Sequence, residues 1–180
     1  MRVAPQPAKP AANRTEQIIL FRVSGQLFAI SSASVQEVRS VDSLAGVSSD
    51  ISQPTIRKVR QVLHRGDKSL YVVNTAMHFG LPVSSAALVF VLRKTRTALL
   101  VDSMERMATM IRLQALPLAY CREERRWYRG LTALEQTVIP VVDAQGFLTN
   151  EEFALLDASR APQASPEASG PAADVPELPQ

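Results

Sequence analysis

The residue types that most often do chemistry are few in this chain, and their spacing does not favour catalysis. The two histidines, His64 and His78, lie fourteen positions apart, and the single cysteine, Cys121, is distant from both in sequence. Zinc needs at least three well-placed ligands, so this set predicts no metal site. A lone cysteine also leaves no partner for an internal disulfide.

The other reactive groups lack the neighbours that would activate them. Asp102 and Asp143 each end an apolar run, where a carboxylate more often caps a turn than joins a catalytic pair. Arg125 and Arg126 would lower the pKa of Cys121, but no histidine lies close in sequence to act as its base. The sequence contains neither a glycine-rich phosphate loop nor a Gly-x-Ser-x-Gly elbow. We therefore expect no enzymatic activity and no cofactor.

Clustered basic residues point to a different chemistry, the binding of nucleic acid. The formal net charge is +3, and Lys or Arg occupies positions 57, 58, 60, 65 and 68. Small β-barrels bind single strands when aromatic side chains interleave with such cations and stack on the bases. Only Tyr71 lies close to this cluster, and aromatic residues make up 6% of the chain. Nucleic-acid binding is therefore the weaker alternative.

The segments that carry these residues contain an internal repeat. Two motifs recur at the same offset of 69 residues, LYVVN at 70–74 with IPVVD at 139–143, and SVQEV at 34–38 with SMERM at 103–107. An Arg-Gly pair precedes each copy of the first motif, at Arg65-Gly66 and at Arg129-Gly130. Equal offsets in separate segments indicate a duplicated unit, which predicts two similar lobes with a groove between them.

Turn residues between apolar runs predict a chain of short strands. Ser24-Gly25 separates apolar runs at 17–23 and 26–30, which is typical of a tight β-hairpin. Gly66 supplies the positive φ that a turn between two further apolar runs requires. The sequence as a whole predicts nine or ten short strands, and this number favours a fold of two small barrels. We expect long loops at 42–56 and 114–126, and a capping box at Thr149 and Glu152 that begins a C-terminal helix.

The two ends of the chain differ from the part between them. Residues 1–15 and 159–180 hold eight of the twelve prolines, and the second stretch also carries three acidic residues, Glu167, Asp174 and Glu177. Such segments bury too little apolar surface to offset the entropy of ordering, so we expect disordered tails. The remaining residues, 16–158, form one domain with lobes at about 16–82 and 83–158. No apolar run is long enough to span a bilayer, and no secretory signal is evident, so we expect a cytoplasmic protein.

The motifs, taken in order, resemble the CheW-like coupling proteins of bacterial chemotaxis. The matching segments are LFAI at 27–30, VQEV at 35–38, HRG at 64–66, LYVV at 70–73, LLVD at 99–102, YRGL at 128–131, VIPVVD at 138–143 and NEEFALLD at 150–157. The resemblance covers about residues 16–158. It implies an all-β fold of two intertwined five-stranded β-barrels related by a pseudo-twofold, with a short C-terminal helix, and the role of a scaffold that catalyses nothing.

The resemblance also implies partners and a site. Members of the family bind the tip of a methyl-accepting chemoreceptor in the groove between the barrels, and they bind the regulatory domain of a chemotaxis-type histidine kinase. The receptor-side positions that match here are Val35 and Glu37 on the third strand, and Arg65 with Gly66 in the turn. Glu37 is expected either to pair with Arg65 or to meet a partner together with it. The resemblance implies no nucleic acid and no insertion into a membrane.

Two segments of the first copy depart from the family pattern. VRQV stands at 59–62 where the family usually has a glycine, and VNTA stands at 73–76 where the family usually has Val-Asp-Leu-Arg. These differences are typical of a diverged member. They leave open a role in another signalling pathway, such as surface motility or gene control.

Overall fold

The computed structural model describes residues 15–46, 48–51, 56–66, 68–120 and 123–160. Its strands are β1 (Glu16–Val23), β2 (Gln26–Ser31), β3 (Val35–Ser40), β4 (Ser48–Asp50), β5 (Val59–Arg65), β6 (Lys68–Asn74), β7 (Leu88–Leu92), β8 (Thr97–Val101), β9 (Ser103–Met110), β10 (Tyr128–Leu134) and β11 (Thr137–Val142). Its helices are α1 (Thr75–His78), α2 (Glu124–Trp127) and α3 (Asn150–Arg160), with short 3-10 turns η1 (Ser32–Ser34) and η2 (Val41–Leu44).

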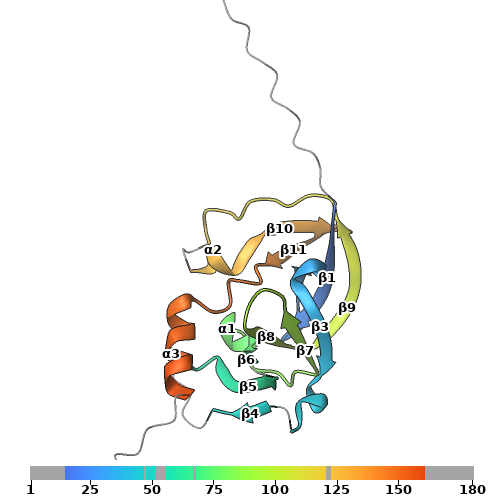
Figure 1. Cartoon of the computed structure of the whole chain (residues 1–180). Helices are drawn as coiled ribbons and strands as arrows, with labels where there is room; N and C mark the ends of the chain where they lie inside the picture. Colours follow the sequence, from blue (N-terminus) through green and yellow to red (C-terminus); the bar gives the residue numbers. More distant parts are fainter. Residues whose placement is uncertain (1–14, 47, 52–55, 67, 121–122, 161–180) are drawn as a thin grey trace, which may run out of the picture.

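The strands form two curved sheets, as expected for an all-β chain with two barrel-like lobes (Figure 1). The first sheet has five strands in the order β10-β11-β2-β1-β9. The second has six, in the order β3-β7-β8-β6-β5-β4. The sixth strand is β4, which lies inside the segment 42–56 expected to be a loop, and α2 begins inside the second expected loop, 114–126.

The 69-residue repeat appears in the pairing of the strands. β6 runs parallel to β8 with Val73 opposite Leu99, and β11 runs parallel to β2 with Val142 opposite Ile30. Each residue of one pair lies 69 positions from its counterpart in the other pair. The register shifts at the starts of β5 and β10 are also 69 positions apart. The sheets are therefore two copies of one arrangement, which is the expected pseudo-twofold.

Each half of the chain contributes strands to both sheets. β1 and β2 join β9, β10 and β11 in the first sheet, whereas β3 to β6 join β7 and β8 in the second. Only the three residues of η1 connect β2 to β3, and β3 then pairs with β7 rather than returning to the first sheet. Each repeat thus gives its first hairpin to one barrel and its later strands to the other.

The two Arg-Gly pairs are not equivalent positions of the repeat. Gly66 lies in the β5–β6 turn with a φ of 55°, the positive value expected from the sequence. Gly130 lies within β10, and its counterpart 69 positions earlier is Gln61 in β5. A Cβ atom on Gly130 would stand 2.3 Å from the backbone oxygen of Gln114, which pairs with Leu131. Glycine is needed at this position because the segment after β9 crosses closely there.

Burial alternates along the strands between two apolar regions. In β6, Leu70 and Val72 belong to the interior of the second barrel, whereas Tyr71 and Val73 belong to a larger core between the two sheets. Successive side chains of a strand point to opposite faces, so a strand buried on both faces is a continuous apolar run. This explains the LYVV sequence. The first barrel has its own smaller core, which includes Leu20 and Val141.

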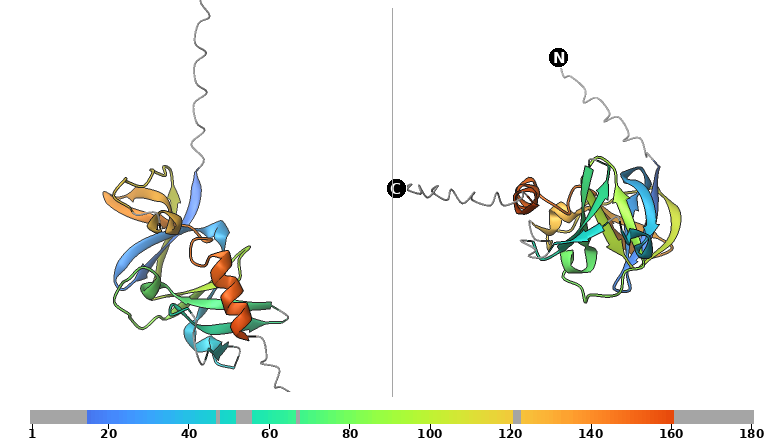
Figure 2. Two further views of the ribbon diagram at one scale, coloured as in Figure 1. Left: turned by 90° about the vertical axis from the view of Figure 1, so that its left-hand side faces the viewer. Right: turned by 60° about the horizontal axis from the view of Figure 1, so that its bottom comes forward.

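The C-terminal helix α3 lies against the second barrel (Figure 2). The expected capping box is present, because the backbone N–H of Glu152 donates to Thr149 Oγ1 at 3.1 Å and the N–H of Thr149 donates to Glu152 Oε2 at 2.9 Å. Leu156 is fully buried in the shared core. Two ion pairs of 2.8 Å, Lys58–Glu152 and Arg96–Asp157, also link α3 to the barrel.

Some expectations fall on parts of the chain that are not described. Cys121 and almost all of the two expected tails lie outside the described residues. Among the helices that are described, none combines the length and the apolar character needed to cross a bilayer.

Candidate partner-binding site

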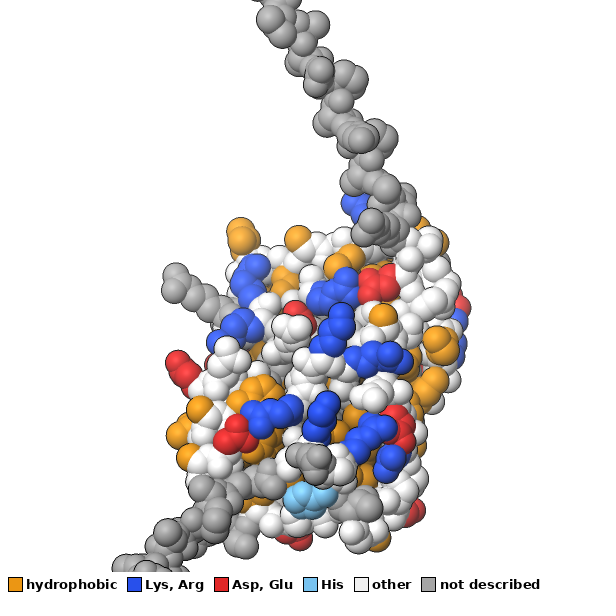
Figure 3. All heavy atoms as spheres, in the orientation of Figure 1, with side chains coloured by type: hydrophobic (Ala, Val, Ile, Leu, Met, Phe, Trp, Pro, Cys, Tyr) orange, Lys and Arg blue, Asp and Glu red, His pale blue; other side chains and the backbone are white. Residues whose placement is uncertain are grey.

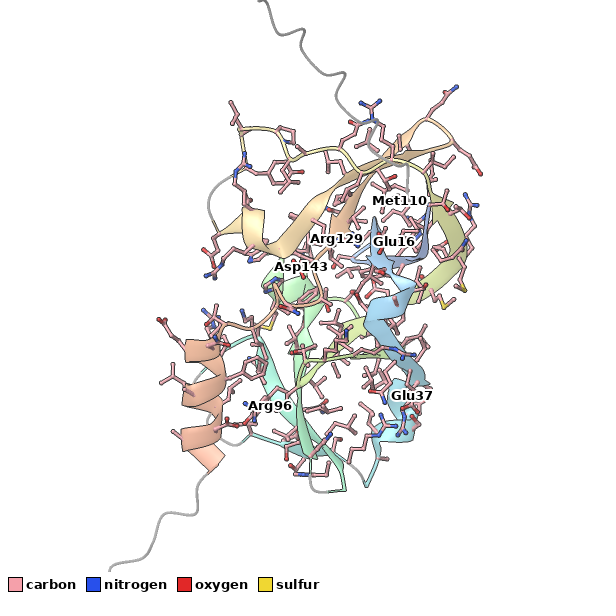
Figure 4. All side chains as sticks on the ribbon, turned by 45° about the horizontal axis from the view of Figure 1, so that its top comes forward. Glu16, Glu37, Arg96, Met110, Arg129 and Asp143 are labelled. Carbon is pink, nitrogen blue, oxygen red and sulfur yellow. The ribbon has the colours of Figure 1, made fainter. Side chains whose placement is uncertain are left out.

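Of the predicted receptor-side residues, Val35 and Glu37 lie on β3, an edge strand of the second sheet, and Arg65 and Gly66 lie at the end of β5 and in the turn after it. Glu37 Oε1 accepts a hydrogen bond of 2.5 Å from Arg39 Nε, and Glu37 Oε2 lies 3.3 Å from Arg65 Nη1. The second contact is an ion pair without hydrogen-bond geometry, since Glu37 Oε2 has no hydrogen-bond partner. It joins β3 to the end of β5, near the opposite edge of the same sheet, and so helps to close the barrel. Figure 4 shows Glu37 on β3 at this edge.

The four predicted residues differ in how much they face solvent. The side chain of Arg65 is 46% exposed and that of Glu37 is 30% exposed, so both can meet a partner. Gly66 stands in an open turn, with no atom within 4 Å of where a Cβ would be. Val35 is 7% exposed and packs into the core. The side chain of Val35 therefore holds β3 in place rather than offering a contact.

The sequence reasoning missed Arg39 as a third member of this cluster. Residues two apart on a strand point to the same face, so Glu37 and Arg39 were recognisable neighbours once β3 was assigned. Gln36 and Val38 alternate with them and are exposed on the other face of the strand. The cluster of Glu37, Arg39 and Arg65 therefore has a net charge of +1, because one carboxylate pairs with two guanidinium groups.

The same place in the first barrel carries an ion pair of reversed polarity. Arg106 in β9 lies 69 positions after Glu37, and Glu135 lies 69 positions after Gly66. Arg106 Nη2 and Glu135 Oε1 are 2.9 Å apart. A partner that recognises charge can therefore distinguish the two barrel edges despite their common fold.

The two histidines lie apart in the structure as well as in the sequence. His64 Nε2 lies 2.9 Å from Ser49 Oγ near the surface. His78 is buried in α1, its ring between 4.7 and 5.0 Å from those of Phe79, Trp127 and Phe147. Burial, together with the nearby charge of Lys58, lowers the pKa of His78 to about 3. Within the described residues, no three His, Cys, Asp or Glu side chains gather as metal ligands.

Neutral His78 keeps an aromatic junction between the barrels free of charge. Lys58 Nζ lies 3.5 Å from His78 Nδ1, so this nitrogen accepts and the proton resides on Nε2. Phe79 also stacks on Phe28 of β2 and on Tyr128 of β10, with ring centroids 4.8 and 5.5 Å apart. α1 from the first repeat therefore packs against strands of the first barrel.

Comparison with known proteins identifies the family and the fold. The family model of the CheW-like domain matches residues 17–152. The fold is similar to the crystal structure of the scaffolding protein TtCheW from Thermoanaerobacter tengcongensis, with a TM-score of 0.64 and 14% identity over 81% of this chain and 96% of that one. Comparison with curated proteins gives no match. Since the family model spans most of its length, the chain belongs to the CheW-like domain family.

Proposed function

We propose that this protein is a cytoplasmic adaptor that couples chemoreceptors to a histidine kinase in chemotaxis-type signal transduction. The observation that carries the proposal is the family match across residues 17–152. The likeness to a scaffolding protein of the same fold supports it. In this role the protein performs no reaction and acts by holding two partners at once.

The receptor side of the proposed adaptor is the β3 edge. An amphipathic helix from a receptor tip would lie beside Glu37, Arg65 and Gly66, in a helix-in-groove mode. Arginine is favoured at the centres of interfaces, and Arg65 is the most exposed of these charged groups. Val35 contributes by positioning β3 from beneath.

The kinase side uses a different surface, since the adaptor must hold both partners together. The proposed partner is the regulatory domain of the kinase. When both are bound, the two conformations of a receptor bias the kinase through a coupling free energy, which is typically about 1–3 kcal/mol. Each contact alone is modest, and an array of receptors strengthens it by effective concentration.

A reconstituted kinase assay tests this function. The rate of kinase autophosphorylation is measured with receptor-containing membranes, with and without the full chain. The proposal expects stimulation only when receptor, adaptor and kinase are all present. An unchanged rate in the complete mixture would contradict it.

The departures in the first copy favour one alternative, a diverged adaptor in another pathway such as surface motility or gene control. In the stretch VRQV at 59–62, where the family usually has a glycine, the side chain of Arg60 is exposed and lines a hollow together with Lys58 and Asp50. A charged residue there alters the surface near β5. Stimulation of a kinase from such a pathway, and of no kinase that controls swimming, would support this alternative.

A further inference from the structure

Two adjoining hollows lie where α3 begins, between the β7–β8 loop and α2. One has a volume of about 550 Å³ and is lined by Lys94 and Arg96, and the other, of about 380 Å³, is lined by Arg125 and Arg126. They share three lining residues, Gln145, Leu148 and Asn150. We name the pair the α3 groove. It is distinct from the β3 edge, because none of its lining residues belongs to β3 or to the β5–β6 turn.

The shape of the α3 groove depends on a close backbone approach. A Cβ atom on Gly146 would stand 2.1 Å from the backbone oxygen of Arg126, so only glycine lets α2 lie this close to the segment before α3. The guanidinium of Arg125 is held by carbonyl groups, with Nη2 2.7 Å from Pro117 O and Nε 3.2 Å from Tyr120 O. These hydrogen bonds hold the Arg125 side chain at the side of the α3 groove. They leave its positive charge unbalanced, because a carbonyl oxygen carries no formal charge.

The α3 groove is positively charged with an apolar floor. Arg96 is bound by Asp157 through two hydrogen bonds of 2.8 and 2.9 Å. In the part of the chain that the structure describes, Lys94, Arg125 and Arg126 form no ion pair with a carboxylate. Asp143 is the remaining acid of the lining, and the floor is formed by Leu148 and Phe153. Figure 3 shows Lys and Arg side chains gathered on this face of the molecule.

This lining selects the chemistry of its occupant. Carboxylates would pair with the three cations, and a small apolar side chain would cover Leu148 and Phe153. Phe153 is the aromatic residue of the lining, and the guanidinium of Arg96 already lies 4.9 Å from its ring centroid. One face of this ring is therefore occupied, and a nucleic-acid base would have a single aromatic side chain to stack on, whereas single-strand sites offer several. An acidic peptide therefore fits better than a single-stranded nucleic acid.

We propose that the occupant is the acidic segment of this chain's own C-terminal stretch, Asp174 to Leu178. Its sequence, DVPEL, places apolar residues beside two carboxylates, and residues 161–180 contain three acidic residues and no Lys or Arg. α3 is about 16 Å long at 1.5 Å per residue, and the chain from Arg160 to Asp174, 14 positions later in the sequence, can span up to about 46 Å. The segment is thus long enough to return from Arg160 to the beginning of α3.

The proposed contact is intramolecular, so a weak affinity suffices. A short tether gives an effective concentration of millimolar order, and opposite charges raise occupancy at low salt. An acidic partner that reaches the α3 groove must then displace the segment. This inference does not depend on the proposed coupling function.

Amide NMR spectra of the full chain test the contact. The wild type is compared with the double variant Asp174→Asn, Glu177→Gln. We expect shift changes at residues 94–96, 125–126 and 145–150 besides those at the substituted positions, and the same residues should shift when about 0.5 M NaCl screens the charges. Shift changes confined to residues 161–180 would overturn the proposal.

Charge reversals in the lining give the matched control. In a Lys94→Glu, Arg126→Glu background, neutralising Asp174 and Glu177 should no longer move the amides of the α3 groove. In an Arg112→Glu background, where the exposed arginine lies outside the lining, the changes should persist.

Changes that disappear on about tenfold dilution would assign the contact to a second copy instead. If adding an oligonucleotide shifts the amide signals of the α3 groove, and neutralising Asp174 and Glu177 does not, the groove binds nucleic acid. Either result would contradict the intramolecular proposal.

Discussion

At the residue scale, the central feature is the carboxylate of Glu37, which contacts Arg39 on its own strand and Arg65 across the seam of the barrel. An exposed ion pair of this kind contributes about 0–1 kcal/mol to stability. The 3.3 Å separation between Glu37 and Arg65 and the partial exposure of both side chains place it in that class. Arg65 can therefore contact a partner with little loss of folding stability.

Replacing Arg65 by Glu should separate binding from folding. We expect the thermal midpoint of Arg65→Glu to stay within a few degrees of the wild type, because the lost pair contributes about 1 kcal/mol at most. Affinity for a receptor-tip fragment, measured by titration calorimetry, should fall at least tenfold, since the charge at the interface is reversed. Arg106→Glu in the other barrel is the control and should bind normally. Retained affinity in Arg65→Glu would remove Arg65 from the contact.

His78 makes the stability of the protein dependent on pH. Its pKa is about 3 in the folded state, below the ordinary value of about 6.5 that applies when the chain is unfolded. The unfolded state therefore binds more protons between pH 3 and 6.5, so stability falls as the pH drops through this window, by up to about 1.4 kcal/mol per pH unit. This part of the stability is fully present above pH 6.5.

Chemical denaturation of wild type and His78→Phe at pH 7 and pH 5 measures this effect. The variant keeps an aromatic ring in the junction and removes the titration. We expect the loss of unfolding free energy between the two pH values to be about 2 kcal/mol smaller in His78→Phe. Equal losses in both proteins would show that His78 is not held neutral by burial.

At the scale of elements, α3 contains both the best predicted feature and one that sequence could not supply. The capping box was readable from Thr149 and Glu152, because its spacing is local. The bonds of Asp157 to Tyr71 and Arg96, at 2.5 and 2.8 Å, join residues more than 60 positions apart. No local pattern specifies such contacts, because the sheet topology decides which strand faces the helix.

Two neighbouring leucines of α3 test how the helix is held. Leu156 is 0% exposed in the shared core, whereas Leu155 is 51% exposed. Leu156→Ala should lower the unfolding free energy by about 2–5 kcal/mol, because it leaves a cavity. Leu155→Ala should change it by less than about 0.5 kcal/mol. Similar effects of the two substitutions, in denaturant unfolding, would mean that α3 does not pack as described.

At the scale of the whole molecule, the duplication was visible in sequence but the exchange of strands was not. The 69-residue offset identified equivalent segments, and the registers around Val73 and Val142 confirm it. The lobes expected at about 16–82 and 83–158 follow the repeat along the chain, and periodicity does not reveal which sheet a strand joins. Local sequence also could not show that Val35 is buried, because β3 alternates only loosely.

The exchange of strands predicts that the two halves of the chain depend on each other. Residues 1–82 and 83–180, produced separately, should each lack cooperative unfolding, because neither holds the strands of one complete sheet. Mixing them should restore a β-rich circular dichroism spectrum and a single thermal transition. A half that melts cooperatively alone would contradict the intertwined arrangement.

The proposed function requires one molecule to hold a receptor tip and a kinase regulatory domain simultaneously through different surfaces. Analytical ultracentrifugation of the full chain with both partners measures this directly. We predict a single sedimenting species with the mass of the ternary complex, which Arg65→Glu reduces to the binary complex with the kinase domain. Mutual displacement of the two partners, or failure of the chain to bind either, would contradict the account.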